Sequence, residues 1–329
     1  MDDFIGVRGV IEPRRLRELS ERSDLRGAVQ AASHMGAIGA STYALSLSWG
    51  TWWAVPLFLL QGMLLGHLYA ALHECDHNTA FRSRRLNIWL GRLFGFVILF
   101  PSDAHKGLHF THHRHTQDFE RDTELLPRKP FANAWQFLWM FSALTYYYHH
   151  IVSIIGYAFR HIPEKAFTES QRATLVTSSR IHLIGYTAIA ASALALESWW
   201  PLTYWIAPMA AAKWTYYFQG LAEHTGLTQH QNTLENTRSF RTNAFMRWLH
   251  WNMTYHTVHH TYPSVPFFRL AELHREVAAR YPHPLPVVTY FGGTIALIRA
   301  LSRQTELELV AAEDVGYQRR HGPKAAARS

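Results

Sequence analysis

Long apolar stretches alternate with charged segments along this chain. Two apolar stretches, residues 28–48 and 52–72, are separated only by the short link Trp49-Gly50-Thr51. Each approaches the roughly 20 residues that a helix needs to cross the hydrocarbon core of a bilayer. The pattern therefore predicts a helical hairpin through a membrane.

A second pair of apolar stretches follows at residues 181–196 and 199–222, joined around Glu197 and Ser198. Trp199 and its neighbouring tryptophans flank this junction, a position typical of the membrane interface. The sequence thus predicts a second hairpin and four spans in total. Two further apolar segments, residues 88–100 and 131–159, are interrupted by Arg and His, and we expect them to lie along the interface.

The distribution of positive charge predicts which side of the membrane each segment faces. The short links at residues 48–52 and 196–201 contain no Lys or Arg, whereas nearly all basic residues lie in the N-terminal arm, the 79–180 segment and the C-terminal third. By the positive-inside rule, both termini and the central segment are cytoplasmic. The N-terminus does not have the pattern of a secretory signal, so we expect it to stay in the cytoplasm.

These patterns predict an all-α integral membrane protein in which two hairpins carry a cytoplasmic helical cap. Its expected parts are a cytoplasmic arm at residues 1–27, a membrane domain at 28–317 and a basic, disordered tail at 318–329.

Composition narrows the class of protein. A hydrophobic share of 48% excludes a disordered chain, while the mean hydropathy of −0.13 requires a large polar part outside the bilayer. Cys75 is the only cysteine, which excludes an intrachain disulfide and a cysteine-based zinc or iron–sulfur site. The net charge of +8 comes from residues that flank spans, and no nucleic-acid-binding motif is present, so we expect no nucleic-acid partner.

Three segments among the 22 histidines have helical spacing. One has histidines at i and i+4, and two have them at i, i+3 and i+4, so the imidazoles of each segment share a helix face. An isolated histidine is more often exposed or hydrogen-bonded than a metal ligand. Eight co-facing imidazoles, however, would repel when protonated and lack partners when neutral, which favours a metal site. The segments are His73-Glu-Cys-Asp-His77, His109-Phe-Thr-His112-His113 and His256-Thr-Val-His259-His260.

His224, at the end of the fourth predicted span, lies at the same expected depth and is predicted as a ninth ligand. Zinc sites usually hold four ligands, whereas nine imidazoles shared by two metals indicate ions of higher coordination number, among which iron suits imidazole. Carboxylates beside the ligands are interpreted as groups that orient imidazole N–H bonds. These are Glu74, Asp76, Asp118, Asp122 and Glu223.

The motifs HECDH, HFTHH and HTVHH, in this order around two hairpins, resemble those of the membrane fatty acid desaturase and hydroxylase superfamily. The segment NMTYHTVHHTYPSVPFFRLAELH resembles its bacterial branch, and the resemblance covers about residues 60–275. It implies a di-iron site that activates O2 and assigns all nine histidines as ligands. Some members have an Asn four residues before the ligand that matches His224; this chain has Gly220 there.

The predicted function is therefore desaturation or hydroxylation of an unactivated C–H position in a lipid or fatty acyl substrate. The chain has neither a GxGxxG fingerprint nor a cysteine cluster, so we expect electrons from a separate ferredoxin, rubredoxin or cytochrome. A carotenoid or a smaller polar metabolite is an alternative substrate. A zinc-dependent membrane hydrolase is the alternative from another class; a metal carrier or pH sensor is disfavoured because the histidines gather at one level.

The fourth predicted span contains a possible substrate-binding stripe. Lys213, Tyr217, Gly220 and His224 follow i, i+4, i+7 and i+11 spacing and so share a helix face. A charge within a membrane span is a candidate functional site, and Gly220 would leave room for a cavity. The alternative is that Lys213 extends to the interface or pairs with Glu197.

Overall fold

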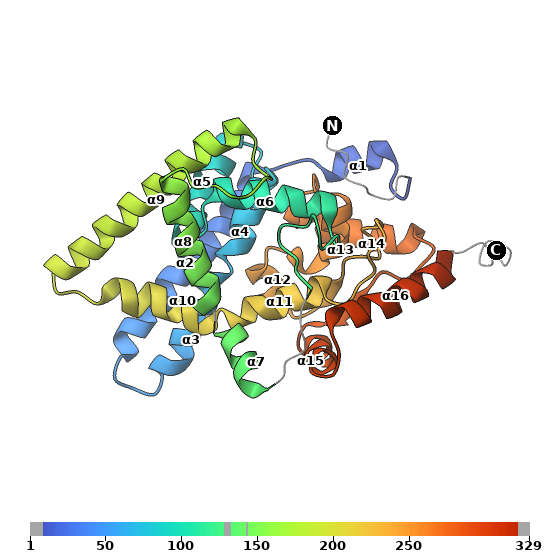
Figure 1. Ribbon diagram of the computed structural model, residues 1–329. Helices are drawn as coiled ribbons and strands as arrows, with labels where there is room; N and C mark the ends of the chain where they lie inside the picture. Colours follow the sequence, from blue (N-terminus) through green and yellow to red (C-terminus); the bar gives the residue numbers. More distant parts are fainter. Residues whose placement is uncertain (1–8, 128–132, 143, 322–329) are drawn as a thin grey trace.

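The computed structural model describes residues 9–127, 133–142 and 144–321 (Figure 1). These residues are mainly helical, as predicted. In this part of the chain the sheet is limited to two short parallel strands, β1 (Ser239–Arg241) and β2 (Val287–Thr289), with Phe240 opposite Val288.

The first predicted hairpin corresponds to α2 (Asp24–Ser48) followed by α3 (Ala54–Gly66) and α4 (Leu68–Asp76). The side chain of Ser23 accepts a hydrogen bond from the Arg26 backbone and caps α2, so this helix begins earlier than the apolar pattern alone indicates. Among the described residues, one helical stretch, Ala54–Asp76, is long and apolar enough to cross a membrane. The other three predicted spans are helical, and their crossing of a membrane stays a prediction.

The second predicted hairpin differs from the expected pair of simple helices. Its first arm is α9 (Glu169–Ala195), which begins well before residue 181 at a capping box formed by Thr168 and Gln171. Its second arm, predicted as one span at 199–222, consists of three consecutive pieces. Figure 1 shows α9 diverging from this second arm. The pieces are η1 (Leu202–Ile206), a π-helical turn, then α10 (Ala207–Ala212) and α11 (Trp214–His224).

Close packing joins the two predicted hairpins through α3 and α10. A Cβ atom at Gly62 would lie 1.9 Å from the carbonyl oxygen of Pro208, so this approach requires glycine. The side chain of Gln61 donates hydrogen bonds to Thr42 Oγ1 at 2.9 Å and to the Tyr204 carbonyl at 3.0 Å. The bundle is thus held by both steric fit and buried polar contacts.

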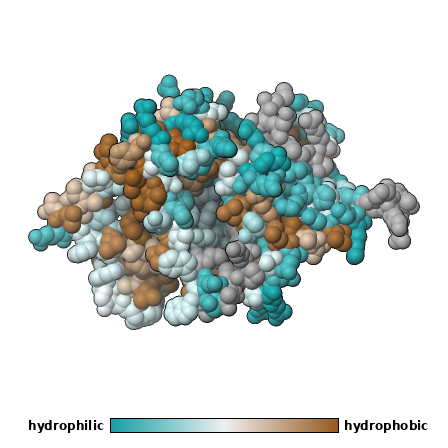
Figure 2. Space-filling model, viewed as in Figure 1, coloured by the Kyte–Doolittle hydropathy of each residue, from teal (hydrophilic) through white to brown (hydrophobic). Residues whose placement is uncertain are grey.

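Figure 1 shows α14 (Leu270–Arg280) and α16 (Glu306–His321) on the side of the molecule away from α9. Apolar surface is concentrated around α8 (Leu144–Ala158), α9 and α10, whereas the side that contains α14 and α16 is mainly hydrophilic (Figure 2). Ile184 and Leu194 on α9 are 69% and 80% exposed. The remaining helices are α1 (Pro13–Leu19), α5 (Arg84–Val97), α6 (Ser102–His115), α7 (Ala134–Phe141), α8 (Leu144–Ala158), α12 (Ala244–Leu249), η2 (Met253–Tyr255), α13 (His256–Thr261), η3 (Phe267–Arg269), α14 (Leu270–Arg280), α15 (Tyr290–Leu301) and α16 (Glu306–His321).

The first residues of the tail that the sequence predicts to be disordered belong instead to the C-terminal helix α16. Residues 318–321 are helical, and the buried carboxylate of Glu235 accepts hydrogen bonds from Arg320 and His321. These contacts order a segment whose composition alone indicates disorder. The rest of the predicted tail, residues 322–329, lies outside the described residues.

Candidate metal centre

Four helices bring the nine predicted ligands together. The first motif ends α4, the second ends α6, His224 ends α11, and the third forms α13. All nine imidazoles are buried, with exposed fractions of at most 8%. The segments are far apart in the sequence, so their convergence is a property of the tertiary fold.

Five of the histidines form one cluster, here called the five-histidine group. Their candidate ligand nitrogens all lie within 4.8 Å of one another. The ring centroids of His73 and His109 are 4.4 Å apart, and those of His77 and His259 are 4.7 Å apart. The members are His73, His77, His109, His113 and His259.

The other four form a second cluster, here called the four-histidine group. Ligand nitrogens of three members lie within 4.8 Å of one another, and Nε2 of His256 lies 2.9 Å from Nε2 of His224. The two groups are adjacent, because the rings of His113 and His260 stack at 4.0 Å between centroids. The members are His112, His224, His256 and His260.

Sequence neighbours divide between the two groups. His112 belongs to the four-histidine group and His113 to the five-histidine group. Likewise, His259 belongs to the five-histidine group and His260 to the four-histidine group. Consecutive residues on a helix point about 100° apart, because one turn contains 3.6 residues. Two helices that face each other can therefore supply ligands to two metals side by side.

Several buried imidazole nitrogens fit a metal better than they fit the protein alone. Within the described part of the chain, His77 Nε2, His260 Nε2 and both ring nitrogens of His259 have no hydrogen-bond partner. Burying such polar atoms without a partner is costly, and a metal ion would accept their lone pairs. Burial lowers the pKa of His259 to about 3, which keeps it in the neutral form that binds metals. The donor set thus fits two metal ions.

Two carboxylates contact the imidazoles of predicted ligands through Nδ1. Nδ1 of His112 lies 2.9 Å from the Asp122 carboxylate, as the prediction for Asp122 requires. Burial lowers the pKa of His112, but the charges of Asp122 and Glu124 raise it more, to about 9. Glu124, which sequence reasoning missed, lies 3.0 Å from Nδ1 of His109. The feature of the sequence that could have identified Glu124 is its position two residues after Asp122.

Two other predicted carboxylates occupy different surroundings. Asp76 lies 2.7 Å from Nδ1 of His105, a buried histidine outside both groups, and accepts a hydrogen bond from Ser102 at 2.6 Å. Asp118 was predicted beside the ligands, but it pairs with Arg121 near the surface. Asp118 caps the turn after α6, and this local role explains why a carboxylate occurs close to the second histidine motif in the sequence.

Glu74 and Glu223 are buried next to predicted ligands in sequence and in space. Glu74 accepts a hydrogen bond from Thr79 Oγ1 at 2.7 Å and lies 3.9 Å from Nδ1 of His73. Glu223 Oε1 accepts a hydrogen bond from Gln219 at 2.9 Å and lies 3.5 Å from Nδ1 of His256. Burial raises the pKa of Glu223 to about 8.

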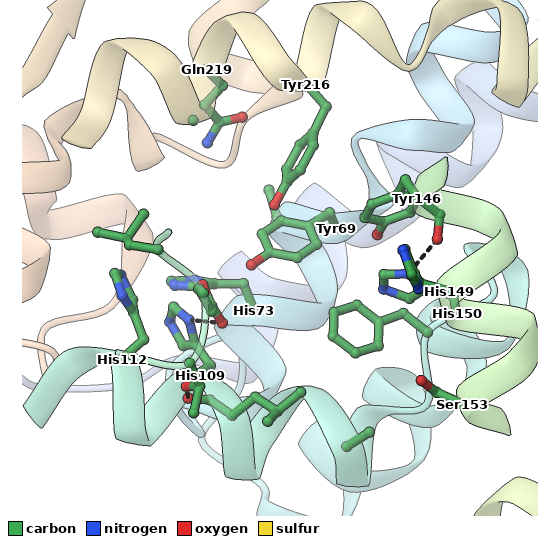
Figure 3. Close-up of a pocket in the computed structure, with 18 of the residues that line it drawn as sticks. Tyr69, His73, His109, His112, Tyr146, His149, His150, Ser153, Tyr216 and Gln219 are labelled. Atoms are coloured by element: carbon green, nitrogen blue, oxygen red, sulfur yellow. Dashed lines mark hydrogen bonds and ion pairs between the residues drawn. The ribbon is translucent and has the colours of Figure 1, made fainter. Parts of the chain in front are cut away.

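A cavity of about 380 Å³ opens beside both groups. Figure 3 shows His73, His109 and His112 at one end and His149, His150 and Ser153 at the other. Apolar side chains, including Leu108, Ile154 and Met253, form part of its wall. The cavity can therefore take an apolar molecule and hold one of its atoms next to the histidines.

The predicted substrate stripe lies only partly on this cavity. Tyr217 and Gly220 line it, and a Cβ atom at Gly220 would meet no atom within 4 Å. Lys213 does not line it. Its Nζ lies 3.7 Å from the ring centroids of both Tyr146 and Tyr216, which do line it. In the described part of the chain, neither an ion pair with Glu197 nor direct access to the cavity is found for Lys213.

Comparison with known proteins gives consistent matches. The family model described as "Fatty acid desaturase" matches residues 50–291. A sn-1 acyl-lipid omega-3 desaturase (ferredoxin) of Synechocystis is 29% identical over 43% of this chain and 42% of its own length. A sphingolipid delta(4)-desaturase of Drosophila melanogaster is 26% identical over 73% of this chain and 70% of its own. A fatty acid desaturase of Bacillus subtilis is 24% identical over 71% and 70%.

Proposed function

The chain belongs to the fatty acid desaturase family, and on that premise we propose that it desaturates a lipid or fatty acyl chain in an O2-dependent reaction at a centre of two iron ions. The observation that carries this proposal is the division of nine buried histidines into two adjacent groups beside one cavity. Hydroxylation of the same C–H position is the second candidate, because both reactions begin with removal of a hydrogen atom.

Iron fits the donor set better than zinc does. Structural zinc is almost always four-coordinate, whereas the five-histidine group alone offers five nitrogens. Imidazole is a good ligand for iron, which adds redox chemistry that zinc lacks. When bound, the two ions would supply the electron transfer that couples reduction of O2 to oxidation of a C–H bond.

The protein's own residues hold the ligands and the substrate. Asp122 and Glu124 accept hydrogen bonds from Nδ1–H of His112 and His109, which leaves Nε2 of each ring for the metal. The apolar wall formed by Leu108, Ile154 and Met253 would orient an alkyl chain. Filling the cavity with this chain would also displace water from the reacting carbon.

We propose that electrons reach the site from another protein. The chain has one cysteine, Cys75, which is buried, so an iron–sulfur cluster of its own is excluded. The Synechocystis relative is named as a ferredoxin enzyme. We propose a ferredoxin, rubredoxin or cytochrome that docks on a basic cytoplasmic face, with the protein embedded in the bacterial inner membrane.

The test begins with the purified full-length protein. Metal analysis should find about two irons per chain. Lipids and metabolites of cells that express the chain with a ferredoxin and its reductase should then be compared with those of cells lacking the chain. A new double bond that depends on O2 and reductant supports the proposal, and a new hydroxyl group supports the second candidate. Bound zinc with activity that persists without O2 would instead identify a hydrolase.

A further inference from the structure

The two histidine groups are unequal, because one offers five nitrogens and the other four. The structure places one further side chain at the smaller group. A carboxylate oxygen of Glu223 lies within 4.8 Å of candidate ligand nitrogens of His224 and His256. Glu223 is thus a candidate fifth ligand of the four-histidine group.

Glu223 is built into the site rather than exposed beside it. It precedes His224 in the last turn of α11, is 6% exposed and lines the cavity. Gln219, one turn earlier, donates a hydrogen bond to Glu223 Oε1 at 2.9 Å. This contact holds the carboxylate in position at the edge of the four-histidine group.

We propose that Glu223 is the tenth ligand of the centre and binds the metal of the four-histidine group through its carboxylate. This inference rests on the two-metal centre proposed above. It gives each of the two metals five ligands from the protein.

Charge supports a carboxylate at this position. Nine neutral imidazoles bring no negative charge to two divalent ions in a buried site, and buried charge is costly unless it is paired. Asp122 and Glu124 contact imidazole rings from the side of Nδ1, whereas a carboxylate oxygen of Glu223 lies within 4.8 Å of candidate ligand nitrogens of His224 and His256. An oxygen ligand also favours the higher oxidation state of iron, so the two ions would become chemically distinct.

A purely orienting role for Glu223 is the main alternative. In that role its carboxylate would accept a hydrogen bond from Nδ1–H of His256, as Asp122 does from His112. The distance from Glu223 Oε1 to His256 Nδ1 is 3.5 Å, compared with 2.9 Å for Asp122 and His112. The longer distance is outside the usual range of a strong charge-assisted hydrogen bond.

The experiment uses the full-length protein loaded with ⁵⁷Fe, with iron per chain and the Mössbauer spectrum as readouts. In the wild type we expect two iron signals of equal area. In Glu223→Gln, the signal of the four-histidine group should shift or disappear, and iron should fall toward one per chain. Glu164→Gln is the matched control, because it removes a carboxylate that lines the same cavity but accepts its hydrogen bond from Tyr157.

A second substitution tests ligation directly. Gly220 lies one helical turn before His224 on the same face, and a side chain there would enter open space. Gly220→Asp combined with Glu223→Gln should therefore restore the second iron signal. Wild-type spectra in Glu223→Gln, equal loss of both signals, or failure of Gly220→Asp to restore the lost signal would each overturn the ligand role. A wild type that binds no iron would instead contradict the proposed function itself.

Discussion

Nδ1 of His112 lies 2.9 Å from both carboxylate oxygens of Asp122. Asp122 is buried, and it also accepts hydrogen bonds from the backbone N–H groups of Glu124 and Leu125. The carboxylate is thus held in place by the turn that follows α6. It selects the His112 tautomer whose Nε2 faces the four-histidine group.

Asp122→Asn is expected to weaken metal binding without unfolding the protein. The amide has a similar shape but lacks the charge that holds Nδ1–H of His112. Loss of such a carboxylate typically lowers metal affinity or activity by roughly 10–100-fold. A competition titration with a chelator measures the affinity, and Asp118→Asn is the control because Asp118 pairs with Arg121. Equal affinities of Asp122→Asn and the wild type would contradict the orienting role.

Metal affinity should rise with pH up to about pH 9. The pKa of His112 in the metal-free protein is raised to about 9, so below that pH a metal must displace a proton from this ring. For folding, the raised pKa contributes stability that is fully present below the ordinary value of 6.5 and is lost as the pH rises through 9. Asp122→Asn should move the rise in affinity to lower pH. Calorimetric titrations in buffers with different ionisation enthalpies count the released protons.

Single ligand substitutions should remove iron selectively. His259→Ala is expected to reduce occupancy of the five-histidine group, and His224→Ala that of the four-histidine group; both should abolish turnover. His112→Ala should resemble His224→Ala. All three variants should stay in the membrane fraction, because helix packing rather than the metal supplies most of the stability. His115→Ala, next to the second motif but outside both groups, is the control. Full iron retention in the three variants would refute the ligand assignment.

Membrane topology can be mapped by cysteine labelling of intact cells. In a Cys75→Ala background, Thr51→Cys and Ser198→Cys should react with an impermeant reagent, because the two short links are predicted to face outward. Glu120→Cys, also at an exposed position, should react only after the cells are opened. Labelling of Glu120→Cys in intact cells would reverse the predicted orientation of the metal centre.

Lys213→Met should change substrate binding while the iron content remains normal. The Nζ atom of Lys213 lies 3.7 Å from the ring centroids of Tyr146 and Tyr216, and these rings form part of the cavity wall. Loss of these contacts would let the rings shift, and we expect a higher KM or an altered position of the product double bond. Chain-length and product analysis by mass spectrometry measures both. If neither changes, Lys213 has a structural role only.

The sequence by itself identified the nine histidines that cluster in the structure. Eight of them follow i, i+3 and i+4 spacing, which places side chains on one helix face whatever surrounds the helix, and His224 was identified from its place at the end of a predicted span. The sequence also indicated Asp122, Tyr217 and Gly220 at the site. These features depend on local geometry, which is encoded within a few residues. For the same reason, the helical character of the four apolar stretches could be predicted from their composition.

Only the tertiary structure decided how the histidines divide between two groups. His112 and His113 are neighbours in sequence, yet their partners come from α11, α13 and α4, and only packing determines which helices face each other. The same holds for Glu124 at His109 and for Lys213, whose Nζ lies against two tyrosine rings and does not line the cavity. Contacts between distant segments depend on the relative placement of whole helices, and no local spacing pattern specifies that placement.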